Sequence, residues 1–219
     1  MGFFYSLLSS AAFGLIPLFS LPLMAQGLSP ATVLFYRFFI ATVVLGLFLI
    51  FRGERFYTSG RNLLKLAGMS LMYTLAALLF IEAFTHLPSG VVATLQFSYP
   101  VMVMLIMTAF YHERFSWITA VAVVLAIAGV YLLSNGSPAG GGPAGSATGI
   151  NAFGLMLALS SAVCNAIYIT SIYAARITNV TGLMLTFYVM AFGALCSLVN
   201  SLASGTFQLL SSWKELALA

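Results

Sequence analysis

Long apolar runs without charged residues constrain the fold of this chain more than any other feature. The run at 90–111 holds no Asp, Glu, Lys or Arg, and about 20 helical residues at 1.5 Å each cross the hydrocarbon core of a bilayer. Charged residues make up 5% of the chain, against about 25% in soluble domains. We therefore predict an all-α polytopic membrane protein. Seven spans are expected, at residues 3–24, 31–51, 63–84, 90–111, 117–133, 152–174 and 181–203.

The basic residues are distributed in a way that predicts the orientation of the spans. Six of the eight Lys and Arg residues stand between spans two and three or at the start of span three, between spans four and five, and between spans six and seven, whereas residues 25–30, 85–89 and 134–149 contain no Lys or Arg. Since basic loops stay in the cytoplasm, this alternation predicts a cytoplasmic N-terminus. We interpret the net charge of +4 as a topology signal and expect no nucleic-acid partner. The residues concerned are Arg52, Arg55, Arg61, Lys65, Arg114 and Arg176.

The sequence offers little for metal or nucleophile chemistry. It has two cysteines, two histidines and no aspartate, and none of them stands at the spacing of a metal site, a catalytic triad or a redox pair. We expect no metal, no cofactor and no enzymatic activity. A membrane-embedded enzyme acting on lipids is a rival hypothesis, but it would need acidic, His or Cys clusters at a membrane face.

A segment rich in glycine, alanine, serine and proline at 134–149 divides the chain. Such a segment cannot bury a core and serves as a flexible linker, so we expect a five-span unit at 1–133 and the start of a second unit at 150–219. Short matches relate the units, since LSSA at position 8 recurs at 159 and FY at position 35 recurs at 187. A repeated unit of five spans must insert in opposite orientations, which is typical of secondary transporters.

The second unit is expected to be incomplete. If it repeats the first in full, three further spans would follow residue 203. The tail at 204–219 has the pattern of an outer loop that leads toward an eighth span near Leu216. We therefore expect this chain to be part of a longer protein, and a full-length relative to have about 300 residues.

Polar residues within the fourth span are the first candidates for a substrate site. Gln96 and Tyr99 stand three positions apart, so on a continuous helix they share one face. Such a face inside a membrane usually meets protein or water. We interpret both as substrate-binding residues, with hydrogen bonding that only holds helices together as the alternative. Pro100 frees a carbonyl near Gln96 and predicts a kink.

Two charged residues within predicted spans are further candidates. Arg37 lies about 10 Å into the second span, where its forked guanidinium suits a substrate carboxylate unless it reaches the outer headgroups. Glu82 is the only acidic residue within a predicted span. It is a candidate for proton coupling or amine binding, or for pairing with Arg37. Tyr73 stands nine positions before Glu82, on the opposite helix face, so the two cannot line one cavity.

The sixth span carries another polar stripe. Ser161, Asn165 and Tyr168 follow one another at offsets of four and three, so a helix presents them on one face. We interpret Asn165 and Tyr168 as substrate-binding residues, with interhelical hydrogen bonding as the alternative. The repeat aligns Asn165 with Gly14, where a break in the first span would expose carbonyl groups to a substrate.

Several of these motifs make the chain similar to the EamA-type branch of the drug/metabolite transporter superfamily. The resemblance rests on a small-residue first span, on Ser29-Pro30 followed by Arg37, on the stretch from Glu82-Ala83-Phe84 through Tyr99-Pro100 to Glu113-Arg114, and on the opening of the sixth span at 154–159. It implies a ten-span fold of two inverted five-span units around a central cavity. It also implies transport of small metabolites, commonly export of amino acids, across the bacterial inner membrane.

We therefore hypothesise a secondary transporter, an exporter of small polar metabolites such as amino acids that works by alternating access. Its expected partners are a small-molecule metabolite and the lipid bilayer. Proton coupling through Glu82 is compatible with the sequence but not required by it. The alternative is a membrane subunit that does not transport, or a half-transporter that depends on a partner. The sequence does not define the oligomeric state.

Overall fold

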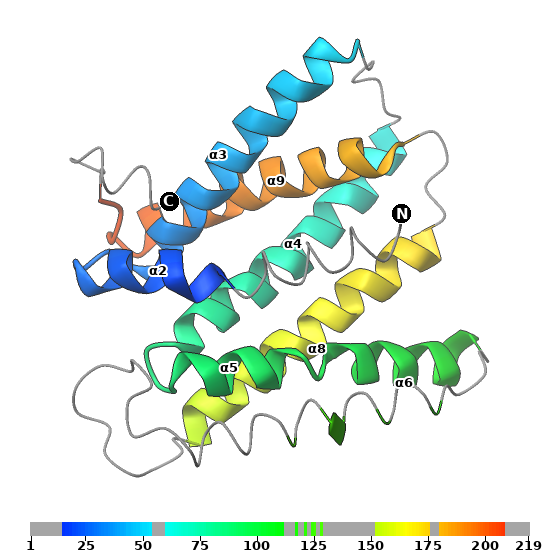
Figure 1. The fold of residues 1–219 in the computed structure, drawn as a ribbon. Coiled ribbons are helices and arrows are strands. Elements are labelled where there is room, and N and C mark those ends of the chain that lie inside the picture. The colour runs from blue at the N-terminus through cyan, green and yellow to red at the C-terminus, as the bar shows by residue number, and fades with distance from the viewer. Residues whose placement is uncertain are drawn as a thin grey trace.

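The computed structural model describes residues 15–53, 60–111, 152–175 and 180–208, with single positions at 117, 121, 124, 125 and 128. All regular elements in this part of the chain are helices (Figure 1). Five helical segments, with α5 and α6 counted as one, are long and apolar enough to cross a membrane. The protein is thus an all-α polytopic membrane protein, as predicted. Its helices are α2 (Ile16–Ala25), α3 (Pro30–Phe51), α4 (Gly60–Ala83), α5 (Ser89–Gln96), α6 (Tyr99–Tyr111), α8 (Ala152–Ala175) and α9 (Gly182–Ala203).

Four of the seven predicted spans coincide closely with helices. The predicted second, third, sixth and seventh spans correspond to α3, α4, α8 and α9, and the largest difference at any end is the start of α4, at Gly60 instead of residue 63. Only the end of the first predicted span is described, as α2, and the fifth is represented by single helical positions. The linker at 134–149 and the predicted start of an eighth span lie outside the described residues.

Local sequence explains where α3 and α9 begin. Ser29 precedes α3, its Oγ accepts the Thr32 backbone N–H at 3.2 Å, and Pro30 occupies the first turn. Thr181 acts in the same way for α9, where its Oγ1 accepts the Met184 N–H at 3.4 Å. These side chains satisfy N–H groups that the start of a helix leaves without intrahelical partners.

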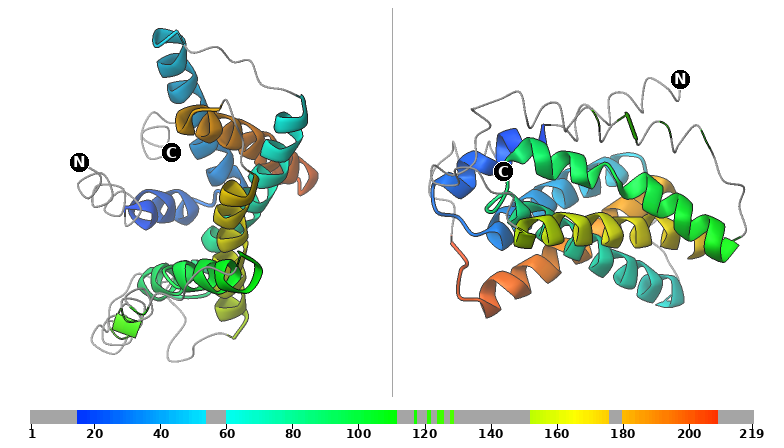
Figure 2. Two further views of the ribbon diagram at one scale, coloured as in Figure 1. Left: turned by 90° about the vertical axis from the view of Figure 1, so that its right-hand side faces the viewer. Right: turned by 90° about the horizontal axis from the view of Figure 1, so that it is seen from below.

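The fourth span is interrupted near Pro100, where the sequence predicts a kink. α5 ends at Gln96 and α6 begins at Tyr99, with a turn at 97–98 between them. Pro100 explains the break, because its ring has no N–H for the Gln96 carbonyl and clashes with the preceding turn. α6 still continues in nearly the direction of α5, as Figure 2 shows, so the pair crosses the bundle as one span.

α4 lies at the centre of the bundle, between α8 on one side and α9 on the other (Figure 1). α3 packs along α9, and α5 and α6 pack across α8, while α2 lies against α3. α8 can approach its neighbours closely because small residues recur at every fourth position of its buried face. They are Gly154, Ala158, Ala162, Ala166 and Thr170.

Large apolar side chains cover the outer faces of the helices. On α3 they include Val43, Val44, Leu47 and Ile50, which are between 45% and 62% exposed. A continuous apolar surface of this kind is unusual for a soluble protein, whereas the core of a bilayer is itself hydrocarbon. These faces therefore fit a lipid environment.

The basic residues that the structure describes at helix ends lie together at one end of the bundle, here named the basic end. Arg52 follows α3, and Arg61 and Lys65 stand in the first turns of α4, at the end where α8 finishes and α9 begins (Figure 1). The Lys65 ammonium donates to the Ala175 carbonyl at 3.4 Å, at the negative end of the α8 dipole. The opposite end carries the connections between α2 and α3 and between α4 and α5, and neither contains Lys or Arg.

Candidate functional site

A cavity of about 70 Å³ lies inside the bundle, enclosed by residues of α2, α3, α4, α5 and α8. Along α3 and α4 it occupies the half away from the basic end, and on α8 it reaches the middle of the helix. A mostly apolar lining with a few convergent polar groups is typical of small-molecule sites. The apolar lining residues are Ile16, Leu34, Phe38, Ala76, Ala77, Phe80 and Ile81, and the polar ones are Arg37, Tyr73, Gln96 and Asn165.

Arg37 is the charged side chain among the described residues that line the cavity. It stands eight residues after Ser29, which is about 12 Å along the axis of α3. Its Nη1 donates to the Oγ of Ser20 on α2 at 2.8 Å, and Ser20 is fully buried. No carboxylate in the described part of the chain pairs with the guanidinium. Arg37 therefore holds a positive charge toward the interior of the bundle rather than at the headgroups.

Gln96, the last residue of α5, is 4% exposed and lies at the cavity wall. Its Oε1 accepts the hydroxyl of Ser161 on α8 at 2.9 Å, and the same hydroxyl lies 2.7 Å from the Ala76 carbonyl of α4. The single proton of Ser161 is shared between these two acceptors. With its oxygen engaged, Gln96 keeps both amide N–H groups free, since no described residue accepts them.

Asn165 and Tyr73 add further unused hydrogen-bonding capacity. Asn165 stands one turn after Ser161 on α8, and Tyr73 reaches the cavity from α4. Neither the Asn165 amide nor the Tyr73 hydroxyl forms a hydrogen bond within the described ranges. Polar groups inside a membrane protein cost free energy when they lack partners. Water or a polar solute in the cavity would supply those partners.

A row of aromatic rings forms the side of the cavity that faces the basic end. Phe38 of α3 stacks on Tyr73 of α4 with ring centroids 5.7 Å apart, and Tyr73 lies 4.9 Å from the ring of Tyr168 on α8. Gly193 of α9 makes room for Phe38, because a Cβ at Gly193 would lie 2.8 Å from the phenyl ring. The row therefore links the shape of the cavity to the packing of four helices.

The structure brings three of the predicted site residues together and places others elsewhere. The residues that line the cavity are Arg37, Gln96 and Asn165. Tyr168 contacts the lining residue Tyr73 without lining the cavity itself. Three predicted residues remain: Tyr99 and Glu82 do not line the cavity, and Gly14 lies outside the described residues.

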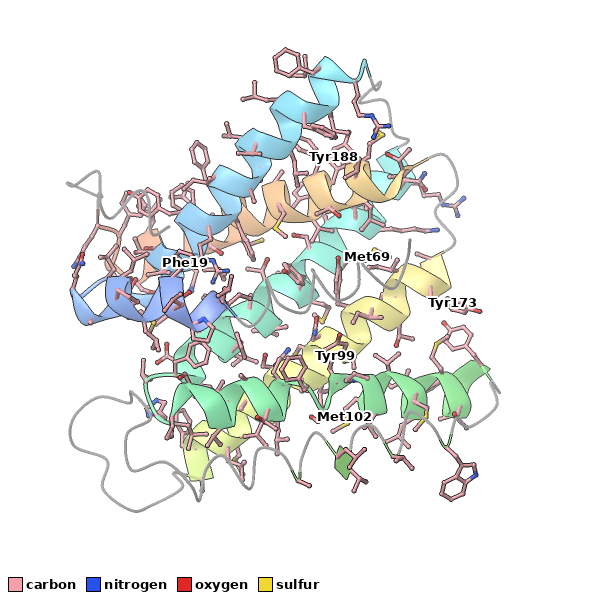
Figure 3. All side chains as sticks on the ribbon, viewed as in Figure 1. Phe19, Met69, Tyr99, Met102, Tyr173 and Tyr188 are labelled. Atoms are coloured by element: carbon pink, nitrogen blue, oxygen red, sulfur yellow. The ribbon has the colours of Figure 1, made fainter. Side chains whose placement is uncertain are left out.

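The positions of Tyr99 and Glu82 have clear physical causes. An offset of three residues places Gln96 and Tyr99 on one face only if the helix is continuous. The turn at 97–98 interrupts the helix, so the two side chains need not share a face. Tyr99 instead opens α6 beside α8, as Figure 3 shows. Glu82 and Tyr73 lie on opposite faces of α4, as predicted, and Tyr73 is the one that faces the cavity. The alternative pairing of Glu82 with Arg37 is not formed.

Tyr73 and Ser20 belong to the site although the sequence did not mark them as candidates. The sequence did contain a hint of Tyr73: because Tyr73 and Glu82 lie on opposite faces of one helix, only one of them can line a cavity. We favoured the charged residue, whereas the structure favours the aromatic one. Ser20 is a single hydroxyl within an apolar run, and nothing in the sequence indicated its contact with Arg37.

The side chains at the cavity are suited to binding rather than to covalent chemistry. They offer a guanidinium, a phenol and two amides, which recognise a solute by charge and hydrogen bonds. In the described ranges, no three His, Cys, Asp or Glu side chains gather where they could hold a metal ion. We therefore treat the cavity as the candidate site for a small solute.

Comparison with known proteins identifies the family. A model of the EamA-like transporter family matches residues 1–135, which is more than half of the 219-residue chain. No curated protein matches the chain. A membrane bundle with a polar cavity at an interrupted helix agrees with a transporter family. The chain belongs to the EamA-like transporter family, and it is a membrane transporter of the drug/metabolite transporter superfamily.

Proposed function

We propose that this protein is a secondary transporter that exports a small polar metabolite, such as an amino acid, by alternating access. The observation that carries the proposal is the cavity, where polar side chains with unused hydrogen-bonding capacity converge from α3, α4, α5 and α8. Hydrogen bonding that only holds helices together is the alternative role for these side chains. Membership in a transporter family supports the same function.

Each polar side chain has a role in this proposal. Gln96, Asn165 and Tyr73 exchange hydrogen bonds with the metabolite, and Arg37 binds a negatively charged group of it. Tyr168 supports the site by holding the ring of Tyr73 in place. Contributions of the remaining predicted residues, Tyr99, Glu82 and Gly14, stay predictions.

The break in the fourth span supplies a moving part. α5 brings Gln96 to the cavity, whereas α6 packs against α8 beyond it. A two-residue turn between half-helices can absorb large changes in backbone angles. Movement of α5 relative to α6 would therefore open and close one wall of the cavity, and many transporters place interrupted helices at their substrate sites.

The proposed orientation follows from the basic end of the bundle. The positive-inside rule places Arg52, Arg61 and Lys65 in the cytoplasm, together with the N-terminus. The cavity then lies in the outer half of a bacterial inner membrane. The proposal includes proton coupling through Glu82, and a Glu82→Gln variant tests this part of it. Unchanged pH dependence of transport in that variant would remove the role.

Counterflow in proteoliposomes tests the proposal directly. Vesicles that contain the purified protein and an excess of one unlabelled solute are assayed for uptake of its labelled form, across amino acids, short monocarboxylates, nucleosides and sugar phosphates. We expect saturable exchange of one class and a loss of about tenfold or more in Gln96→Ala, because this variant removes hydrogen bonds to the solute. Gln26→Ala is the matched control, since Gln26 is exposed in the turn before α3.

Two outcomes would oppose the proposal in different ways. Exchange that Gln96→Ala leaves unchanged would move the substrate site away from the cavity. No exchange of any class by monodisperse protein would contradict transport by this chain alone. That second result would favour the alternative of a membrane subunit that depends on a partner.

A further inference from the structure

Most polar groups around the cavity are hydrogen-bond donors, and the charge among them is positive. Arg37 has five N–H groups, and its recorded hydrogen bond uses only Nη1, toward Ser20. The oxygen of Gln96 accepts Ser161, and no described residue accepts its two amide N–H groups. Tyr73 and Asn165 lie in the same cavity, and each can donate as well as accept. A partner that satisfies this set must be rich in acceptors and negatively charged.

In the described part of the chain, no negative charge meets this requirement. The sequence contains four acidic residues, all of them glutamates. Glu82 is the one within a predicted span, and it neither lines the cavity nor pairs with Arg37. Glu54, Glu113 and Glu215 lie outside the described residues. A guanidinium inside a membrane is costly without a counter-charge, so an anion that enters the cavity stabilises it.

We propose that the cavity selects small organic monoanions by their carboxylate group. Arg37 binds the carboxylate through the fork of its guanidinium, and Gln96 and Tyr73 donate to the remaining lone pairs. A free ammonium group finds no carboxylate there, so a simple carboxylate is preferred over an amino acid. This inference rests on the proposed function and narrows its substrate class.

The size and the walls of the cavity fit the same class. Leu34, Phe80 and Ile81 form an apolar wall suited to a short hydrocarbon body. The volume of about 70 Å³ is well below the roughly 300–1,000 Å³ of common small-molecule sites, so larger solutes require the walls to move. One guanidinium balances one negative charge, whereas a phosphate dianion would bring a second charge without a partner.

Ligand-induced stabilisation of the purified chain in detergent tests the preferred charge class. The probes are acetate, propionate, butyrate and 3-methylbutanoate, each compared with its amide and with the amino acid of the same skeleton, at constant ionic strength and neutral pH. A ligand that binds the folded state raises its unfolding temperature in a saturable way. We expect at least one carboxylate to bind about tenfold or more tightly than its amide and its amino acid, because hydrogen bonds to charged groups are stronger.

Variants of Arg37 assign the preference to its guanidinium. Arg37→Gln should abolish the difference between carboxylate and amide, and Arg37→Lys should retain part of it because the charge stays while the fork is lost. Arg52→Gln is the matched control, since Arg52 is exposed at the end of α3, above the ring of Phe48. Should an Arg37 variant not fold, the comparison of carboxylate and amide on the unaltered protein still decides.

Several results would overturn the inference. They are equal affinity for carboxylate, amide and amino acid, no saturable stabilisation by any of the carboxylates, and unchanged selectivity in Arg37→Gln. These failures are distinguishable from a failure of the proposed function. Counterflow of a neutral or cationic solute that is lost in Gln96→Ala would uphold the transporter and reject only the anion.

Discussion

Two regions of the bundle place polar side chains inside the membrane, and they use them in opposite ways. Where α3 meets α9, the Thr32 hydroxyl lies 2.8 Å from Ser201 Oγ, 2.9 Å from Ser29 Oγ and 3.1 Å from the Thr206 carbonyl. Around the cavity, four polar side chains keep groups that no described residue satisfies. The first region completes its hydrogen bonds within the chain, and the second leaves them open.

This contrast defines a test for each region: Thr32 as a side chain that holds helices together, and Gln96 and Asn165 as side chains that bind a solute. Side-chain hydroxyl groups occur in both regions, and each alone is compatible with interhelical hydrogen bonding. Thr32 is surrounded by acceptors and donors of its own chain, so it fastens α3 to α9. Gln96 and Asn165 face an interior space, so a solute completes their hydrogen bonds.

The largest effect is expected where the two regions meet, at Gly193 of α9. A Cβ there would lie 2.8 Å from the ring of Phe38 and 3.0 Å from the Oγ1 of Thr74. Gly193→Ala should push Phe38 toward the cavity, and overpacking of this kind costs about 1–3 kcal/mol. We expect a lower free energy of unfolding together with reduced transport. Unfolding in detergent and counterflow in vesicles measure the two effects.

Gly68→Ala in α4 is the control for Gly193→Ala. A Cβ at Gly68 meets nothing within 4 Å, and alanine is favoured over glycine in a helix by about 1 kcal/mol. This variant should be at least as stable as the parent and should transport normally. Normal transport by a destabilised Gly193→Ala protein would show that the contact between α3 and α9 does not shape the cavity.

Asn165→Leu should lower affinity without lowering stability. The change removes a half-buried amide that has no partner among the described residues. We expect the affinity for the transported solute to fall about tenfold through the loss of one hydrogen bond. Stability should stay the same or rise by up to about 1 kcal/mol, because an apolar side chain needs no partner. A clear loss of stability would instead identify Asn165 as a residue that holds helices together.

Thr32→Val should lower stability without lowering affinity for the solute. Its effect should be the smallest of the three substitutions, after Gly193→Ala and Asn165→Leu. Hydrogen bonds between transmembrane helices contribute about 0.6 kcal/mol on average and up to about 1.7 kcal/mol. A double-mutant cycle of Thr32→Val with Ser201→Ala should yield a coupling in this range, while the affinity for solute stays unchanged. Thr42→Val is the control, because the Thr42 hydroxyl donates at 2.7 Å to Phe38, within its own helix. A change in solute affinity would extend the site to this region.

The spans could be predicted from sequence because their limits depend on local properties. Hydropathy fixed the extent of α4 and α8, and the residues Ser29 and Thr181 mark the starts of α3 and α9 through side-chain hydrogen bonds to the first turn. Pro100 likewise predicted a distortion near Gln96, and the structure shows a break there. Each of these signals acts within one helix.

The composition of the site was harder to predict, because it depends on which helices become neighbours. Helical offsets place residues on a face, but they do not say whether that face meets another helix or a space. Tyr73 and Glu82 illustrate this limit. The helical offset places them on opposite faces of α4, but only the position of α8 shows which of the two faces meets the cavity. Tyr99 shows a second limit, because an offset loses its meaning across a break.

Charge-selective labelling at position 165 tests most directly whether the cavity is an accessible site that attracts anions. Asn165→Cys is introduced into a chain in which Cys164 and Cys196 are replaced by alanine. Two reagents are compared, the anionic 2-sulfonatoethyl methanethiosulfonate and the cationic 2-trimethylammonioethyl methanethiosulfonate. For each reagent, the reaction rate of Asn165→Cys is divided by the rate of the exposed control Gln26→Cys. We predict a higher relative rate for the anionic reagent and loss of this preference with Arg37→Gln. No reaction with either reagent would contradict an accessible site at this cavity, and a preference for the cation would contradict its selection of anions.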